Sequence, residues 1–114
     1  MKIREIQEIL NAQLVTGEEY LDTEVKSACG CDMMSDVLAF VKDQSILITG
    51  LVNPQVVRTA LMMDMKCIVF VRGKRPDEKV VELARENDLV ILTTEMRMYN
   101  ACGELYVRGL QAGD

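Results

Sequence analysis

Histidine and tryptophan are absent from this sequence, and aromatic residues are few, with two phenylalanines and three tyrosines. Histidine is the most common general base in enzymes and the most common nitrogen ligand of zinc. Its absence excludes Ser-His and Cys-His nucleophile pairs and every metal site built on imidazole. Catalysis would depend on carboxylates, lysine or cysteine, so we expect a protein that is not an enzyme.

The sequence also lacks long hydrophobic runs and an excess of positive charge. No stretch approaches the roughly 18 apolar residues of a membrane-spanning helix, and the N-terminal segment carries charges throughout. The net charge is −5, which argues against binding to nucleic acid or to an anionic membrane. Four cysteines without a secretory segment are typical of reduced thiols, so we predict a cytoplasmic location.

The residues that are present suit one aliphatic core. Hydrophobic residues make up 49% of the 114 residues, and eight methionines supply adaptable filling. This length is typical of one domain, so we expect a single domain over residues 1–114.

Three short apolar runs predict the centre of the fold, at 45–50, 66–71 and 89–94. Each run is continuous rather than alternating, as in strands buried on both faces of a parallel sheet. Residues 25–31 are predicted to add a strand, and 14–25 a strand and a turn. We expect an α/β fold: a single domain with a central, mainly parallel sheet of about four to five strands, flanked by helices and joined by right-handed crossovers.

Helical patterns lie between these runs. Residues 53–64 begin with Asn53 as the N-cap and Pro54 at the first helical position. The next helix is predicted to open at Pro76, where the following carboxylates favour the positive end of the helix dipole.

Two further helices are predicted, at 33–41 and at 94–110. The apolar stripe of the first is expected to consist of Met34, Val37, Leu38 and Val41. Thr94 is the expected N-cap of the last helix, and Gly103 is expected to permit close packing within it.

In a parallel α/β sheet, ligands bind where strands end and helices begin. The sequence places small, polar and charged residues at these junctions. We therefore predict a ligand-binding site from the following set: Asp32, Ser35, Asp36, Thr49, Asn53, Arg72, Gly73, Lys74, Thr93 and Thr94.

The turn at 71–78 (VRGKRPDE) has one glycine and three basic residues before the predicted helix start. Free backbone N–H groups, the helix dipole and side-chain charge would converge there on an anion. The turn matches neither the Walker motif nor G-x-G-x-x-G, and a plain solvated loop is the alternative.

Other polar residues of the set also have two interpretations. Asp32 is expected to cap the helix at 33–41, or else Asp32 or Asp36 holds a ligand, a cation or a partner. The hydroxyls of Thr49, Thr93 and Thr94 either donate to a phosphate or cap helices.

Cys29 and Cys31 are candidates for a metal or redox site. On a strand they share one face, with Gly30 on the other, and the structural interpretation is that both thiols are simply packed. The methionines at 61–66 either cover a subunit interface or fill space under the sheet.

The order of three motifs is similar to that of a known family. CDMMSDVLAF is similar to S-D-x-L-S-D-V-x-A, SILITG to a strand ending in Ile-Thr, and residues 71–94 to T-G-G-x-x-P-D-E followed by I-L-S-T. Over nearly its whole length the chain resembles the DRTGG-domain family. The family's Thr-Gly-Gly falls on 71–73, a position often histidine in hydrogenase-associated members is Asn53, and the name-giving motif is missing.

The resemblance implies a fold like the N-terminal domain of HPr kinase. Such domains occur alone near iron-only hydrogenase components, fused to phosphotransacetylases, and between CBS modules and a pyrophosphatase domain. They are regarded as regulatory or dimerising, without established catalysis.

We therefore expect a small non-catalytic regulatory domain that forms a homodimer. Its expected ligand is a small anionic metabolite, an adenine nucleotide or another phosphate-containing molecule, bound at the strand ends, and we expect no other cofactor. One alternative is a homodimerising interaction module without a small ligand. Another is an iron–sulfur or redox accessory protein, with a protein partner in a metabolic or hydrogenase system.

Overall fold

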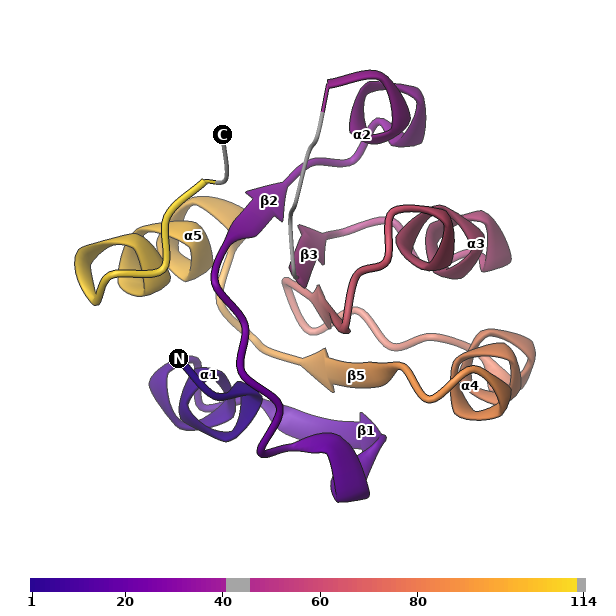
Figure 1. Cartoon of the computed structure of the whole chain (residues 1–114), viewed down its shortest axis with the longest axis horizontal. Helices are drawn as coiled ribbons and strands as arrows, with labels where there is room; N and C mark the ends of the chain where they lie inside the picture. The colour runs from indigo at the N-terminus through magenta and orange to yellow at the C-terminus, as the bar shows by residue number, and fades with distance from the viewer. Residues whose placement is uncertain (41–45, 113–114) are drawn as a thin grey trace.

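Four consecutive strands run parallel through the computed structural model, which describes residues 1–40 and 46–112 (Figure 1). The sheet order is β1-β5-β4-β3-β2, and β1 pairs with β5 in the antiparallel sense. The expected mainly parallel α/β sheet is confirmed. The strands are β1 (Gln13–Thr16), β2 (Ala28–Gly30), β3 (Ile46–Thr49), β4 (Cys67–Phe70) and β5 (Val90–Thr93).

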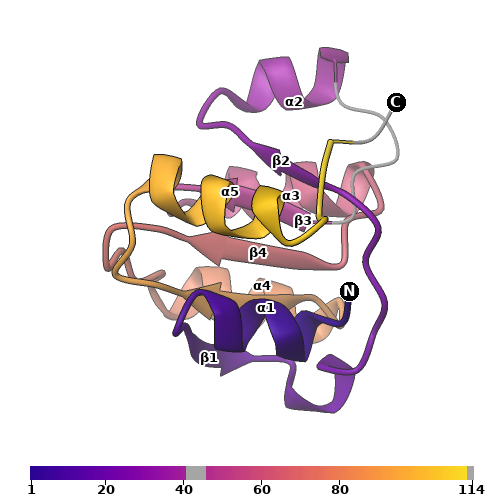
Figure 2. The same ribbon diagram turned by 90° about the vertical axis from the view of Figure 1, so that its left-hand side faces the viewer.

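Helices cover both faces of this sheet (Figures 1 and 2). They are α1 (Ile3–Ile9), α2 (Met34–Phe40), α3 (Pro54–Met62), α4 (Glu78–Glu86) and α5 (Met98–Val107), with a 3-10 turn, η1, at Glu18–Tyr20. The crossover helices α2, α3 and α4 share one face, while α1 and α5 pack on the other. The chain therefore changes face between α4 and α5.

Side chains of β3, β4 and β5 are buried on both faces, which explains their continuous apolar runs. Alternate residues point to opposite helix layers. Those facing α1 and α5 include Ile46, Ile48, Val69 and Leu92, and those facing α2 to α4 include Leu47, Ile68, Phe70 and Ile91.

Helix starts differ in how well the sequence predicts them. Asn53 Oδ1 accepts the Val56 N–H at 3.3 Å and Pro54 opens α3, so this N-cap is confirmed. The expected start of α4 at Pro76 is wrong. Asp77 Oδ1 accepts the Val80 N–H at 3.1 Å, so Asp77 is the N-cap and the helix begins at Glu78, two residues after Pro76.

The last helix is shorter than predicted, and Thr94 is not its N-cap. Helix α5 begins at Met98, with Arg97 in the N-cap position. Thr94 instead donates its hydroxyl to Leu10 O at 2.7 Å, which fixes it beside the end of α1. The residues between Thr94 and Met98 connect the end of β5 to the layer that contains α5.

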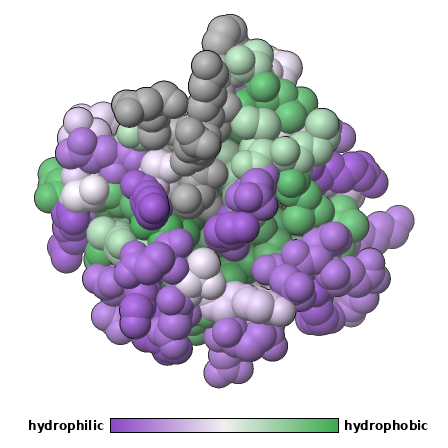
Figure 3. Space-filling view, in the orientation of Figure 1, coloured by the Kyte–Doolittle hydropathy of each residue, from purple (hydrophilic) through white to green (hydrophobic). Residues whose placement is uncertain are grey.

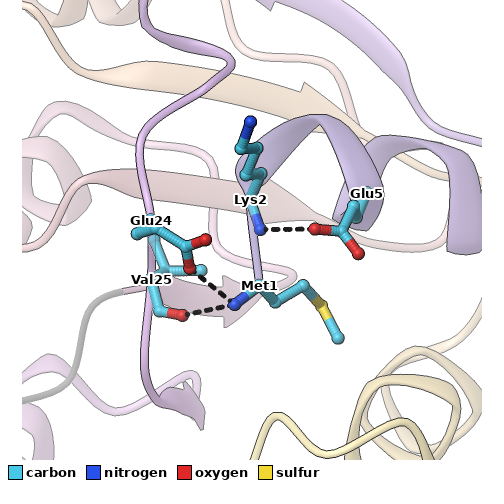
Figure 4. Close-up of polar contacts among 5 residues, drawn as sticks. All are labelled: Met1, Lys2, Glu5, Glu24 and Val25. Atoms are coloured by element: carbon cyan, nitrogen blue, oxygen red, sulfur yellow. Dashed lines mark hydrogen bonds and ion pairs between the residues drawn. The ribbon is translucent and has the colours of Figure 1, made fainter.

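Helix α1 is fastened to the segment that follows η1 (Figure 4). The Met1 ammonium donates to Glu24 Oε2 at 2.8 Å and to Val25 O at 3.2 Å. The first of these bonds, together with the ammonium charge, holds the pKa of Glu24 below its ordinary value. The Lys2 N–H donates to Glu5 Oε1 at 3.0 Å, within the first turn of the helix.

Large apolar side chains also remain on the surface. Figure 3 shows a hydrophobic area over α2 and α3. Met33, just before α2, and Met62, at the end of α3, are 59% and 71% exposed. On α5, Tyr99 is 89% exposed. Leu38, expected on the buried stripe of its helix, is exposed, and Val41 lies outside the described residues. Within the described ranges, no helix combines the length and apolar character needed to span a bilayer.

Two glycines have opposite surroundings. A Cβ on Gly30 would lie 2.6 Å from Cys102 Sγ, whereas a Cβ on Gly103 would meet nothing within 4 Å. The close packing expected at Gly103 is therefore missing from its described surroundings, and it is Gly30 that permits a close approach.

We expect Gly103→Ala to stabilise the fold by about 0.5 to 1 kcal/mol, because alanine lowers the entropic cost of forming the helix. Gly30→Ala should destabilise it by about 1 kcal/mol or more, because Cys102 must move. Urea unfolding of the two matched variants measures both effects. A loss of stability in Gly103→Ala would contradict an open environment at that position.

Candidate functional site

The carboxyl ends of the four parallel strands meet at one edge of the sheet, on the left of Figure 2. In register, Thr49 lies beside Phe70, and Phe70 lies beside Thr93. Each strand is followed there by a loop that leads to a helix, so we searched this carboxyl edge for a ligand site.

The gap between the ends of β4 and β5 is the expected place for a ligand, because their loops lead to helices on opposite faces. In this protein the gap is closed. Three hydrogen bonds join the two loops: Arg72 N–H to Met96 O at 2.8 Å, Gly73 N–H to Thr94 O at 2.9 Å, and Thr93 Oγ1 to Lys74 O at 2.7 Å. We call these three bonds the loop lock.

The turn after β4 was expected to bind an anion through free backbone N–H groups, but these groups are bonded within the protein. Lys74 N–H donates to Val71 O at 3.1 Å, and the φ angles of Arg72 and Gly73 are +58° and +68°, as in a type I′ turn. The backbone N–H groups of Arg72, Gly73 and Lys74 are therefore all hydrogen-bonded within the protein. The prediction that they are free to bind an anion is wrong. The start of α4 also carries its own carboxylates, on Asp77 and Glu78.

Asp32 connects the ends of β2 and β3. Its Oδ1 accepts hydrogen bonds from Thr49 Oγ1 and from the Gly50 N–H, both at 2.8 Å. Thr49 Oγ1 in turn accepts from the Leu51 N–H at 3.2 Å. The prediction that Asp32 caps α2 is therefore wrong. Among the described residues, no partner is found for its second carboxylate oxygen.

The Arg72 side chain lies close to the same glycine. A Cβ placed on Gly50 would be 3.0 Å from Arg72 Nη2, so the guanidinium rests on bare backbone. Arg72, Lys74 and Arg97 are exposed, and none of them forms an ion pair with any residue in the described ranges.

Charges at the starts of the nearby helices favour binding of an anion near the end of β3 rather than elsewhere along the carboxyl edge. The first turn of α3 has no acidic residue, whereas those of α2 and α4 contain Asp36 and Glu78. The positive end of the α3 dipole is therefore not neutralised by its own side chains. An anion at this edge would meet the least repulsion between Arg72 and the start of α3.

The remaining predicted site residues are distributed as follows. Ser35 and Asp36 lie exposed in the first turn of α2, and Asn53 is occupied as a cap. Thr93 and Thr94 are buried, and their hydroxyls donate to backbone carbonyls. The structure thus gathers Asp32, Thr49 and Arg72 around Gly50, and it separates the two later threonines from them.

Gly50 and Arg97 were missed by the sequence reasoning. The signal for Gly50 was its place directly after a strand. Arg97 was hidden inside the helix predicted from Thr94.

Hollows on the described surface lie outside this cluster. A cavity of about 230 Å³ lies on the far side of β5, lined by Asn11, Ala12, Gln13, Thr93 and Glu95. A larger groove of about 460 Å³ lies between α3 and α4, away from the sheet, lined by Pro54, Arg58, Glu78, Lys79, Glu82, Leu83 and Glu86.

The cysteines behave as packed thiols. Cys29 and Cys31 lie on the α2 to α4 face, and Gly30 faces Cys102 on the other, as predicted. Burial, with a smaller contribution from the neighbouring thiols, raises the pKa of Cys29 to about 11. A thiol with a raised pKa is a poor nucleophile and metal ligand. In the described part of the chain no cluster of three or more cysteine, aspartate or glutamate side chains is arranged to hold a metal.

Comparison with solved structures identifies a related fold. The chain superimposes with a TM-score of 0.75 on a crystal structure of the CBS and DRTGG domains from the regulatory region of Clostridium perfringens pyrophosphatase, in complex with its activator diadenosine tetraphosphate. The two sequences are 21% identical, and the match covers 96% of this chain but 47% of the other. This chain therefore spans about half the length of that regulatory region.

Comparison with curated protein sequences finds no significant match. A model of the DRTGG domain matches residues 5–105, which is most of the chain, including the strands, the loop lock and Gly50. The protein therefore belongs to the DRTGG domain family.

Proposed function

We propose that this DRTGG domain is a non-catalytic regulatory module that binds a small anionic metabolite at its carboxyl edge. The observation that carries the proposal is the unpaired guanidinium of Arg72, which rests on Gly50 close to the start of α3. Both the positive end of the α3 dipole and the N–H donors of the Arg72 guanidinium would attract an anion bound there.

The opposite charge of Asp32 narrows the class of ligand. Its carboxylate touches Gly50 through the backbone N–H, and one of its oxygens is available for a further donor. A bare anion would be repelled by this carboxylate. A nucleotide or a sugar phosphate carries both a phosphate for Arg72 and hydroxyl donors for Asp32, so we propose a ligand of this class.

The related pyrophosphatase regulatory region supports a regulatory role, because it is activated by a nucleotide, diadenosine tetraphosphate. That region is about twice as long as this chain and contains CBS domains as well. The likeness therefore supports the class of function that we propose.

We expect AMP, ADP or diadenosine tetraphosphate to raise the unfolding temperature, since a ligand at 100 times its Kd adds about 2.7 kcal/mol of stability. Lys74→Ala should weaken binding about two- to fivefold, the effect of one exposed charge. Lys66→Ala is the matched control, because Lys66 precedes the amino end of β4 while Lys74 follows its carboxyl end. Isothermal titration calorimetry measures the affinities.

Two outcomes would contradict this proposal. The first is an absence of binding by the whole panel at millimolar concentration. The second is equal weakening by Lys74→Ala and Lys66→Ala, which would show that only the overall charge of the protein matters.

A second candidate function, homodimerisation, is favoured by the outer face of α5. Tyr99 and Tyr106 are 89% and 57% exposed, and they lie two helical turns apart with Gly103 between them. Val107 beside them is 78% exposed. Paired tyrosines around a glycine would let two copies of α5 approach closely.

If α5 forms the dimer interface, Tyr99→Glu should shift the protein towards a monomer, because a charge would be buried against its own copy. Met62→Glu is the matched control, since Met62 is 71% exposed on the opposite helix layer. Sedimentation equilibrium measures the dissociation constants. A strictly monomeric parent protein would contradict the second function. If the dimer were lost only in Met62→Glu, the interface would lie at Met62 on α3 rather than on α5.

A further inference from the structure

Arg72 has an unusual backbone conformation for its residue type. Its φ angle is +58°, in the left-handed region that is disfavoured for side chains with a Cβ. Every other described residue with a positive φ is of a type that tolerates this region. These are Asn11, Gly17, Asp64, Gly73, Asp88 and Gly109. Arg72 is the exception among them.

The strain at Arg72 is imposed by the surrounding backbone. The turn from Val71 to Lys74 requires a positive φ at both central positions, for which glycine and asparagine are the usual residues. The Arg72 N–H is held by Met96 O at 2.8 Å and the Gly73 N–H by Thr94 O at 2.9 Å, so the turn cannot relax. A strained residue that its neighbours over-determine is a reason to look for a function of its side chain.

We propose that Arg72 is the residue that recognises the oxyanion of the ligand, and that the protein keeps it in a strained position for this purpose. This inference rests on the proposed function and deepens it. The backbone N–H groups of the turn from Val71 to Lys74 are already bonded, so this turn can recognise an oxyanion only through its side chains. Gly50 supplies a flat backbone surface on which the guanidinium lies, with its charge unpaired by any described residue.

This proposal predicts that stability and binding change in opposite directions at one position. Arg72→Gly should raise the unfolding temperature, because glycine adopts the left-handed region without strain. The same change should weaken binding of AMP at least tenfold, since it removes a charge-assisted fork. Arg72→Ala should weaken binding equally without raising the unfolding temperature, because alanine keeps a Cβ.

Asp64→Gly is the matched control, since Asp64 also has a positive φ, of +55°, but lies in the turn after α3 at the opposite end of the sheet. It should leave the affinity for AMP unchanged. Thermal unfolding and calorimetry on the full chain give both readouts for all three variants.

The possible failures are distinct. If the parent protein binds none of AMP, ADP and diadenosine tetraphosphate, the proposed function fails, and this inference fails with it. If the parent binds AMP and Arg72→Ala binds it as tightly, the oxyanion is recognised elsewhere. This inference and the placement of the site at Gly50 are then overturned, while a regulatory binding function stands. If Arg72→Gly is less stable than the parent, the arginine side chain holds the turn together, and its role is structural.

Discussion

The loop lock is the constraint on which the rest of the carboxyl edge depends. In an open α/β sheet, the gap between strands whose helices lie on opposite faces is the usual place for a ligand. Here three hydrogen bonds close that gap between β4 and β5, and each uses a group that would otherwise serve a ligand. Closing this gap leaves Gly50, at the end of β3, as the place where opposite charges approach bare backbone. The candidate site lies at Gly50 because the loop lock closes the gap between β4 and β5 to a ligand.

The sequence predicted the sheet well and the polar bonds of its edge poorly, and the physical reason is the range of the interactions. Continuous apolar runs and the Asn53 cap reflect local preferences, so they can be recognised within a few residues. Thr94 bonds to Leu10, which is 84 positions away, and Asp32 bonds to Thr49 through the pairing of β2 with β3. No local pattern contains such information. The sequence therefore predicted that these residues follow the carboxyl ends of the strands, but it did not predict how their hydroxyls and carboxylates are bonded.

Asp32 and Arg72 share Gly50 without forming an ion pair, which bears on the selectivity we propose. A direct pair would neutralise both groups and leave little for a ligand to bind. Instead, the Asp32 carboxylate is held by Thr49 and by the Gly50 N–H, both at 2.8 Å, while the Arg72 guanidinium lies over the same backbone. In the function we propose, the carboxylate would repel simple anions, while ligands that also offer hydrogen-bond donors would be accepted. Selectivity would then come from one repulsive and one attractive group beside the same glycine.

The loop lock also offers a physical route between our two proposed functions. Met96, whose carbonyl accepts the Arg72 N–H, lies two residues before the start of α5, the helix that exposes Tyr99 and Tyr106. A ligand that pulls on the Arg72 side chain therefore acts on a turn bonded directly to the segment that leads into this helix. A ligand can shift an equilibrium only as far as its affinity differs between two states. If binding and dimerisation both occur, their coupling would be measured by the change in ligand affinity between monomer and dimer, and the Arg72–Met96 bond is the contact through which it would pass.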